Sequence, residues 1–286
     1  MPAIHTLHLD RPILELDAAY VQGRAHLVGH TDTELVGQAA SVIGIGHHWN
    51  AERFAKFPDL RVISRMGIGY DNVDLDAARA AGVVVCNGPD SPTVSTAEHA
   101  VMLLLAVTKE LPIQQARAAE GIGGPAVASS LELDGATLGL VGLGRIGVRV
   151  ARAALGLGMR VIASDPGIEQ SPIDDVELVG LDELFATSHV ISLHAPSTPA
   201  TRHMINADSI ASMRRGVYLV NCARGPLIDQ DALVAAIDSA HVAGAALDVT
   251  DPEPLPIGHP LLTRPNVIIT PHIASSTAVG RRRLFE

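Results

Sequence analysis

Short apolar runs alternate with segments of helical periodicity along most of the chain. In the first third, runs rich in aliphatic residues predict strands, and the segments between them predict helices. The predicted strands are residues 4–9, 25–29, 41–46, 61–64 and 83–86, and the predicted helices are residues 33–40, 51–56 and 75–81. This alternation of strands and helices predicts a parallel sheet of the α/β class.

The pattern changes near Ser95. The residues Ser95-Thr96-Ala97-Glu98 have the spacing of a capping box, so they predict the start of a helix in which Glu98 acts mainly as a cap. Pro112 is predicted to end that helix, and the polar, glycine-rich residues 120–130 predict a surface loop. A second alternating series follows, with predicted strands at residues 137–141, 160–164, 190–194, 218–221, 244–248 and 267–270.

The two series predict two domains, residues 1–95 and residues 96–272. The length of 286 residues fits two domains of roughly 150 residues each. The tail, residues 273–286, is predicted to begin a helix that returns toward the first domain.

Composition and charge narrow the class of protein. The chain is 47% hydrophobic and 18% charged, which favours a folded protein with a large aliphatic core. Its net charge of −10 argues against a nucleic-acid partner. Cys86 and Cys222 lie in hydrophobic runs without disulfide or metal-ligand spacing, so both are predicted to be buried thiols and no metal is expected. Without a signal segment or a membrane-spanning run, the expectation is a cytoplasmic protein with no membrane partner.

A glycine-rich turn carries the first candidate chemistry. Gly142, Gly144 and Gly147 fit G-x-G-x-x-G between a predicted strand and a predicted helix. In such a turn the first glycine permits the bend, the second lets a pyrophosphate approach and the third lets the helix pack closely. Asp165 ends the next predicted strand, where a carboxylate accepts both ribose hydroxyls and repels a 2′-phosphate, so NAD is predicted rather than NADP. The alternative is a plain glycine turn with a solvated Asp165.

Three further polar residues follow predicted strands of the second series. Arg224, Glu253 and His272 should therefore meet at one edge of the sheet. Oxidation of a hydroxy acid needs a base near neutrality, a carboxylate that orients it and a cation for the substrate carboxylate. The alternatives are an exposed turn at Arg224, a solvated Glu253 and a histidine at 272 that is satisfied by its surroundings.

Several of these segments together resemble the D-isomer-specific 2-hydroxyacid dehydrogenase family. The resemblance runs from about residue 40 to the end of the chain. It is carried by the glycine motif at residues 142–147, by Arg65-Met-Gly-Ile-Gly-Tyr-Asp-Asn-Val-Asp74, by Asn221-Cys-Ala-Arg-Gly225, by Ala246-Leu-Asp-Val249 with Glu253, and by Pro271-His-Ile-Ala274.

The resemblance implies a flavodoxin-like substrate domain and a Rossmann NAD-binding domain, both doubly wound, with a cleft between them, hinge closure and a homodimer built on the NAD-binding domain. It implies that His272 is the acid/base, that Glu253 is its partner and that Arg224 binds the substrate. It also implies that Asp248 contacts the nicotinamide carboxamide and that the backbone of Arg145 and Ile146 lies beside the pyrophosphate. The loop of Cys222 and Ala223 would lie beside the nicotinamide. The amides around Gly67, Ile68 and Gly69 would receive the substrate carboxylate.

Differences among members of this family narrow the choice of substrate. Phosphoglycerate-type relatives tend to carry a basic residue just after the strand at residues 41–46, where this chain has His47-His48-Trp49. Phosphite-oxidising relatives have a lysine at Ile68, and formate-oxidising relatives lack a glutamate like Glu253. A small acid with an uncharged tail, such as glyoxylate, hydroxypyruvate, pyruvate or glycerate, is therefore favoured, with 3-phosphoglycerate as the alternative.

Two questions stay open. The residues His47, His48 and Trp49 either line the substrate pocket or are a packed tryptophan beside two surface histidines. The alternative function is that of an NAD(H)-sensing, corepressor-like binding protein with little or no turnover.

Overall fold

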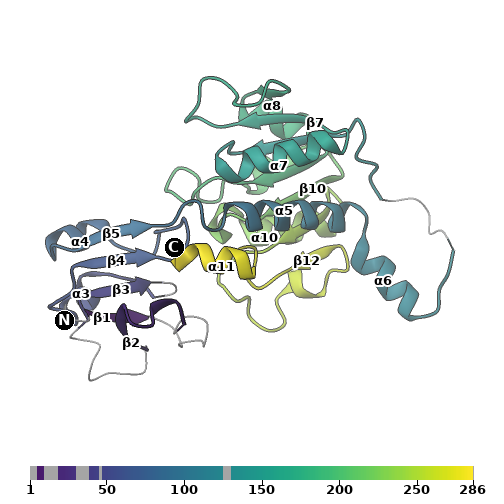
Figure 1. Ribbon diagram of the computed structural model, residues 1–286. Helices are drawn as coiled ribbons and strands as arrows, with labels where there is room; N and C mark the ends of the chain where they lie inside the picture. Colours follow the sequence, from purple (N-terminus) through teal and green to yellow (C-terminus); the bar gives the residue numbers. More distant parts are fainter. Residues whose placement is uncertain (1–4, 10–18, 30–38, 45–46, 125–129, 286) are drawn as a thin grey trace. The chain divides into compact units, whose positions relative to one another are not determined.

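The computed structural model describes residues 5–9, 19–29, 39–44, 47–124 and 130–285 (Figure 1). The chain divides into two compact units. Unit 1 comprises Met1–Pro92 and Ala278–Glu286, and unit 2 comprises Thr93–Thr277. The predicted boundary at residues 95 and 96 lies a few residues inside unit 2.

Unit 1 is built on a 5-stranded parallel sheet in the order β2-β1-β3-β4-β5. This is the strand order of flavodoxin-like doubly wound sheets. Its elements are β1 (His5–Leu9), β2 (Ala25–Val28), β3 (Ser41–Gly44), α3 (Ala51–Ala55), β4 (Val62–Arg65), α4 (Leu75–Ala80), β5 (Val84–Asn87) and, from the end of the chain, α11 (Ala278–Phe285). The helix predicted at residues 33–40 lies mostly outside the described residues.

Trp49 belongs to the hydrophobic core of unit 1. Its side chain is 1% exposed, and its ring centroid lies 5.5 Å from that of Phe54 and 5.0 Å from that of Phe57. The guanidinium carbon of Arg53 lies 4.8 Å from the same centroid, close enough for a cation–π interaction. Trp49 is thus a packing residue, and the interpretation that it lines a substrate pocket is wrong.

Unit 2 is built on a 7-stranded parallel sheet in the order β12-β11-β10-β9-β6-β7-β8. Counted from β6, this is the classic dinucleotide-binding order with one strand added at the edge. Its strands are β6 (Thr137–Val141), β7 (Arg160–Ser164), β8 (Val176–Leu178), β9 (Val190–Leu193), β10 (Val217–Asn221), β11 (Val242–Leu247) and β12 (Val267–Ile269). The predicted α/β class with parallel sheets is confirmed.

Helices flank this second sheet. They are α5 (Thr93–Thr108), α6 (Leu111–Ala119), α7 (Arg145–Gly156), α8 (Leu181–Thr187), α9 (Ala207–Ser212) and α10 (Gln230–Asp238), with 3₁₀ turns η1 (Gly225–Leu227) and η2 (Pro260–Thr263). Helix α5 packs beside α7 and against β10, β11 and β12, whereas α6 leads away from α5 (Figure 1). Within the described residues, none of the helices combines the length and the apolar character needed to cross a membrane.

The start of α5 differs from the prediction. The helix begins at Thr93, so Ser95 lies inside it and Glu98 is an exposed residue of its second turn rather than a cap. The hydroxyl of Ser95 lies 2.7 Å from that of Thr277 and is used in a tertiary contact. The capping-box prediction is wrong because the helix begins two residues before Ser95, whose hydroxyl contacts Thr277.

Three smaller expectations are also wrong, and one strand was missed. Helix α5 ends at Thr108, and Pro112 stands in the first turn of α6, where its missing N–H is not needed. The tail helix begins at Ala278 rather than at residue 273. Cys86 is exposed, because β5 is the edge strand of its sheet, whereas Cys222 is buried as predicted. The edge strand β8 was not predicted at all.

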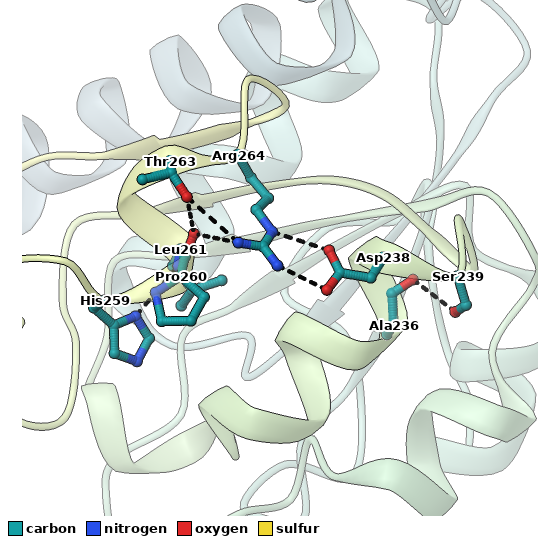
Figure 2. A network of polar contacts seen from close by, with 8 residues as sticks. All are labelled: Ala236, Asp238, Ser239, His259, Pro260, Leu261, Thr263 and Arg264. Carbon is teal, nitrogen blue, oxygen red and sulfur yellow. Dashed lines mark hydrogen bonds and ion pairs between the residues drawn. The ribbon is translucent and has the colours of Figure 1, made fainter.

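An ion pair fastens the segment that precedes β12. The Arg264 guanidinium donates two hydrogen bonds to the Asp238 carboxylate, of 2.9 and 2.7 Å, and a third of 3.0 Å to the carbonyl of Pro260 (Figure 2). This fork joins the end of α10 to η2. The strand that leads to His272 is therefore anchored at its beginning.

Candidate active site

The glycine turn has the geometry of a phosphate-binding turn. Gly142 follows β6 with φ +98°, and a Cβ there would lie 2.8 Å from the carbonyl oxygen of His194. A Cβ at Gly147 would lie 2.3 Å from the carbonyl oxygen of Gly142. A Cβ at Gly144 would meet nothing within 4 Å, although Gly144 is the N-cap of α7. Gly142 and Gly147 are therefore required by the fold, whereas Gly144 borders open space beside the amides of Arg145 and Ile146.

Asp165 lies at the end of β7, next to this turn. Its Oδ2 accepts a 2.8 Å hydrogen bond from the N–H of Leu143, and its Oδ1 accepts one of 2.8 Å from the N–H of Gly167. Asp165 also borders an open hollow of about 540 Å³, lined among others by Pro166, Ile168 and Leu178. A carboxylate held at the carboxyl end of the second strand, beside a hollow, has the placement of a ribose-binding acid.

His272 and Glu253 form the central pair. His272 Nδ1 lies 2.5 Å from Glu253 Oε1, and the two side chains are 48% and 39% exposed. The hydrogen bond to Glu253 raises the pKa of His272 above its ordinary value, while burial and the charge of Arg224 act in the opposite direction. With Nδ1 bonded to a carboxylate, Nε2 is the nitrogen that can exchange a proton with a ligand.

The backbone of His272 is held in an unusual conformation. Its φ is +51°, in the left-handed region that non-glycine residues seldom adopt. Its N–H donates to the carbonyl of Asp248 at 2.8 Å and to that of Thr270 at 2.9 Å. The ring is thus presented from a tight turn at the carboxyl end of β12.

The side chain of Asp248 lies inside this turn. It accepts hydrogen bonds from the Thr270 hydroxyl at 2.5 Å and from the amides of Ile273 and Ala274, each at 2.9 Å. The side chain is fully buried. Asp248 therefore organises the segment that carries His272, in addition to the nicotinamide contact that the resemblance implies.

Arg224 follows β10, and hydrogen bonds of its neighbours fix the backbone around it. Asn221 Nδ2 donates to the Arg224 carbonyl at 2.8 Å, and the N–H of Ala223 donates to Asn221 Oδ1 at 2.9 Å. A Cβ at Gly225 would lie 2.0 Å from the carbonyl oxygen of Thr250, so only glycine fits after Arg224. The neighbouring Cys222 is buried, and burial raises the pKa of its thiol.

The candidate anion-binding loop belongs to unit 1. Gly67 has φ +121° and its carbonyl accepts from the N–H of Gly88 at 3.0 Å. The carbonyl of Ile68 accepts from Asn87 Nδ2 at 2.8 Å, and that of Gly69 accepts from Arg65 Nε at 3.2 Å. The loop after β4 is therefore fixed through its carbonyl groups.

The structure brings Arg224, Glu253, His272 and Asp248 together within unit 2, at the ends of the adjacent strands β10, β11 and β12. Two residues near them were missed. His99 and Thr270 both contact the Asp248 carboxylate. The signal for His99 was a polar residue four positions before the fully buried Leu103, on the buried side of α5.

A parallel sheet with this strand order, a glycine turn after its first strand and an imidazole–carboxylate pair at its carboxyl edge defines a dinucleotide-binding α/β protein. A family model described as D-isomer specific 2-hydroxyacid dehydrogenase, NAD binding domain, matches residues 101–274. The chain belongs to the D-isomer specific 2-hydroxyacid dehydrogenase family, and unit 2 carries its NAD-binding domain.

Known relatives agree with this assignment. A hydroxypyruvate reductase of Thermotoga maritima is 44% identical over 228 residues, which are 79% of this chain and 74% of the relative. A D-3-phosphoglycerate dehydrogenase of Mycobacterium bovis is 41% identical over 258 residues, 90% of this chain but 47% of the relative. The crystal structure of a D-lactate dehydrogenase of Aquifex aeolicus, complexed with NAD and lactic acid, superposes with a TM-score of 0.89 at 31% identity and covers 98% of this chain and 92% of that one. The chain spans about half the length of the phosphoglycerate dehydrogenases that it resembles.

Proposed function

We propose that this chain exchanges a hydride between NAD(H) and C2 of a small D-2-hydroxy acid or 2-oxo acid. The observation that carries the proposal is the 2.5 Å contact between His272 and Glu253, at the edge of the NAD-binding sheet and within electrostatic reach of Arg224. Family membership supports the reaction class.

In this reaction NADH supplies the hydride and the chain supplies the proton. His272 carries that proton on Nε2 and gives it to the C2 oxygen during reduction, or removes it during oxidation. Glu253 orients the ring through Nδ1 and stabilises the imidazolium form. The raised pKa of His272 favours the protonated ring, which suits reduction of the oxo acid near neutral pH.

Substrate binding is assigned to Arg224 and to the substrate-binding domain predicted at residues 1–95, most of which lies in unit 1. The guanidinium can hold the substrate carboxylate and polarise the C2 oxygen. The amides around Gly67, Ile68 and Gly69 are proposed to receive a carboxylate, as an anion-binding nest does. Support comes from the fixed carbonyl groups of this loop, which leave its conformation well defined.

Cofactor binding is assigned to the glycine turn and to the loop after β10. The amides of Arg145 and Ile146, beside the open space at Gly144, bind the pyrophosphate. Asp165 binds the ribose and selects NAD over NADP. Cys222, Ala223 and the Asp248 segment form the nicotinamide side of the site.

For the substrate we favour an acid with a short uncharged tail. Ile68 presents an exposed apolar side chain beside the proposed carboxylate site, and His47 and His48 are exposed after β3. The relative named as a hydroxypyruvate reductase agrees with a small substrate, and those named as D-3-phosphoglycerate dehydrogenases keep 3-phosphoglycerate as the alternative.

A panel of oxo acids tests the proposal. NADH oxidation is followed by loss of its fluorescence with glyoxylate, hydroxypyruvate, pyruvate and 3-phosphohydroxypyruvate. We expect turnover with at least one small acid and a lower kcat/KM for the phosphorylated one. The highest kcat/KM with 3-phosphohydroxypyruvate would reverse the substrate assignment. Tight NADH binding without turnover across the panel would replace the enzyme by an NAD(H)-sensing protein.

We also propose that a second copy of this chain covers α6. No residue of α6 is buried, and Leu111 at its start and Ile122 just after it are exposed large apolar residues. A symmetric dimer built on unit 2 would bury this surface. Sedimentation should give a dimer for the parent chain and a monomer for Leu111→Asp, and a monomeric parent would refute the assignment.

We propose that the chain works in the cytoplasm. Cys86 and Cys222 are both free thiols, and Cys86 is exposed, which suits a reducing compartment. Fractionation of cells that express the chain with its own termini should recover it with soluble cytoplasmic enzymes. Recovery from an oxidising compartment would contradict this placement.

A further inference from the structure

A second imidazole lies behind the segment that carries His272. His99 projects from α5 and its side chain is 12% exposed. Its Nε2 lies 3.1 Å from the hydroxyl oxygen of Thr270 and 3.3 Å from Oδ1 of Asp248. It thus reaches two residues that are more than a hundred positions away in the sequence.

The hydrogen bonds define which atom of His99 carries a proton. The Thr270 hydroxyl has one proton, and it donates that proton to the Asp248 carboxylate. The same oxygen can therefore only accept from His99, so Nε2 of His99 is protonated. The result is a directed chain of hydrogen bonds from His99 through Thr270 to Asp248.

The end of this chain holds the backbone on both sides of His272. The Asp248 carboxylate accepts from the amides of Ile273 and Ala274, and the carbonyls of Asp248 and Thr270 accept from the amide of His272. A non-glycine residue keeps a φ of +51° only where its surroundings determine it. The hydrogen bonds to Asp248 and Thr270 hold His272 in this conformation.

The geometry points to His99 as a positioning residue that holds the His272 imidazole in place through Thr270 and Asp248. The inference rests on the proposed function, in which His272 is the proton donor. His99 does not touch the reacting atoms. It limits how far the turn at residues 270–274 can move, and a proton donor displaced by a fraction of an ångström loses rate.

Four variants test this role. His99→Leu removes the donor, whereas His99→Gln places an amide N–H close to the position of Nε2. Thr270→Val removes only the hydroxyl in the middle of the chain. His241→Leu is the matched control, because its Nε2 makes a single 3.1 Å contact with the carbonyl of Met213 elsewhere in unit 2. This control substitution should lower the free energy of unfolding without moving His272.

Two activity measurements separate positioning from folding. We expect His99→Leu and Thr270→Val to lower kcat about 10- to 100-fold while the Kd for NADH changes less than about twofold. The solvent deuterium isotope effect on kcat should rise in both, because proton transfer becomes slower relative to the other steps. An inactive fraction of protein would lower kcat without changing that isotope effect. His99→Gln should recover most of the lost kcat, and His241→Leu should match the parent in both quantities.

Amide hydrogen exchange tests the same inference without turnover. The amides of Ile273 and Ala274 should exchange about tenfold faster in His99→Leu than in the parent or in His241→Leu, because their acceptor is less constrained. If the parent turned over no oxo acid, the proposed function would fail while this measurement still decided the role of His99. Parent-like kcat, isotope effect and exchange in His99→Leu, or equal losses in His99→Leu and His241→Leu, would overturn the inference.

Discussion

His272 Nδ1 and Glu253 Oε1 lie 2.5 Å apart, although the two residues come from loops after different strands. Each loop leaves the carboxyl edge of the same sheet, after β11 for Glu253 and after β12 for His272, and these strands are neighbours. The carboxylate can therefore bind one nitrogen of the ring and leave the other to a ligand. It also raises the pKa of the His272 ring, so the ring keeps its positive charge to a higher pH.

Replacement of Glu253 should move the pH profile of reduction. In the parent, kcat/KM for an oxo acid falls as the pH rises through the raised pKa of His272. In Glu253→Gln the imidazolium loses its negative partner, while burial and Arg224 still lower the pKa. The falling limb of the kcat/KM profile should move to lower pH. An unchanged limb would show that another group sets it.

The same pair predicts a pH-dependent difference in stability. A histidine whose pKa is raised in the folded state adds stability that is fully present below its ordinary pKa near 6.5 and is lost as the pH rises through the raised value. Glu253→Gln should therefore lower the thermal unfolding midpoint most at pH 5.5 and least at pH 9. A difference that grew with pH would mean that the interaction does not favour the imidazolium.

Removal of the His272 ring separates catalysis from cofactor binding. His272→Gln should lower kcat about 10²- to 10⁴-fold, the usual contribution of a general acid. Its Kd for NADH, measured by fluorescence titration, should change little, because the glycine turn and Asp165 lie on other strands. Equal losses of kcat and of NADH affinity would assign His272 a structural role.

Much of the fold could be predicted because apolar periodicity is strong in buried parallel strands. Strands β6 and β7 have the predicted bounds. All five residues of β6 are buried, and four of the five residues of β7 are buried or partly buried. The edge strand β8 was missed because three residues, Val176–Leu178, are too few to show alternation. The start of α5 was misplaced because Ser95 makes a contact with Thr277, and no local pattern reveals a partner so distant.

Some residues of the candidate site could also be predicted from the sequence, and others could not. Arg224, Glu253 and His272 were recognisable because each stands directly after, or in the loop that follows, a strand of one sheet. The role of His99 was not recognisable, because its hydrogen bonds reach Thr270 and Asp248 across the sequence. Such a role depends on how α5 packs on β11 and β12, which is tertiary information.

Cofactor preference should depend on the charge of Asp165. Asp165→Asn keeps an oxygen that can accept from the N–H of Leu143 but removes the charge that opposes a 2′-phosphate. The ratio of kcat/KM for NADH to that for NADPH should fall, with little change in the thermal midpoint. An unchanged ratio would remove Asp165 from the ribose site.

Two glycines of one turn should respond oppositely to the same substitution. In Gly144→Ala the new methyl group meets no atom within 4 Å beyond the neighbouring residues of the chain, so the thermal midpoint should stay close to that of the parent. The methyl group would instead occupy the space assigned to the pyrophosphate, and the Kd for NADH should rise about tenfold or more, roughly 1.4 kcal/mol of binding free energy. In Gly147→Ala the methyl group would lie 2.3 Å from the carbonyl oxygen of Gly142, and the free energy of unfolding should fall by about 1–3 kcal/mol. Calorimetry and fluorescence titration on both variants measure the two effects side by side. Normal NADH affinity in a fully folded Gly144→Ala would show that the pyrophosphate does not approach the chain at this turn.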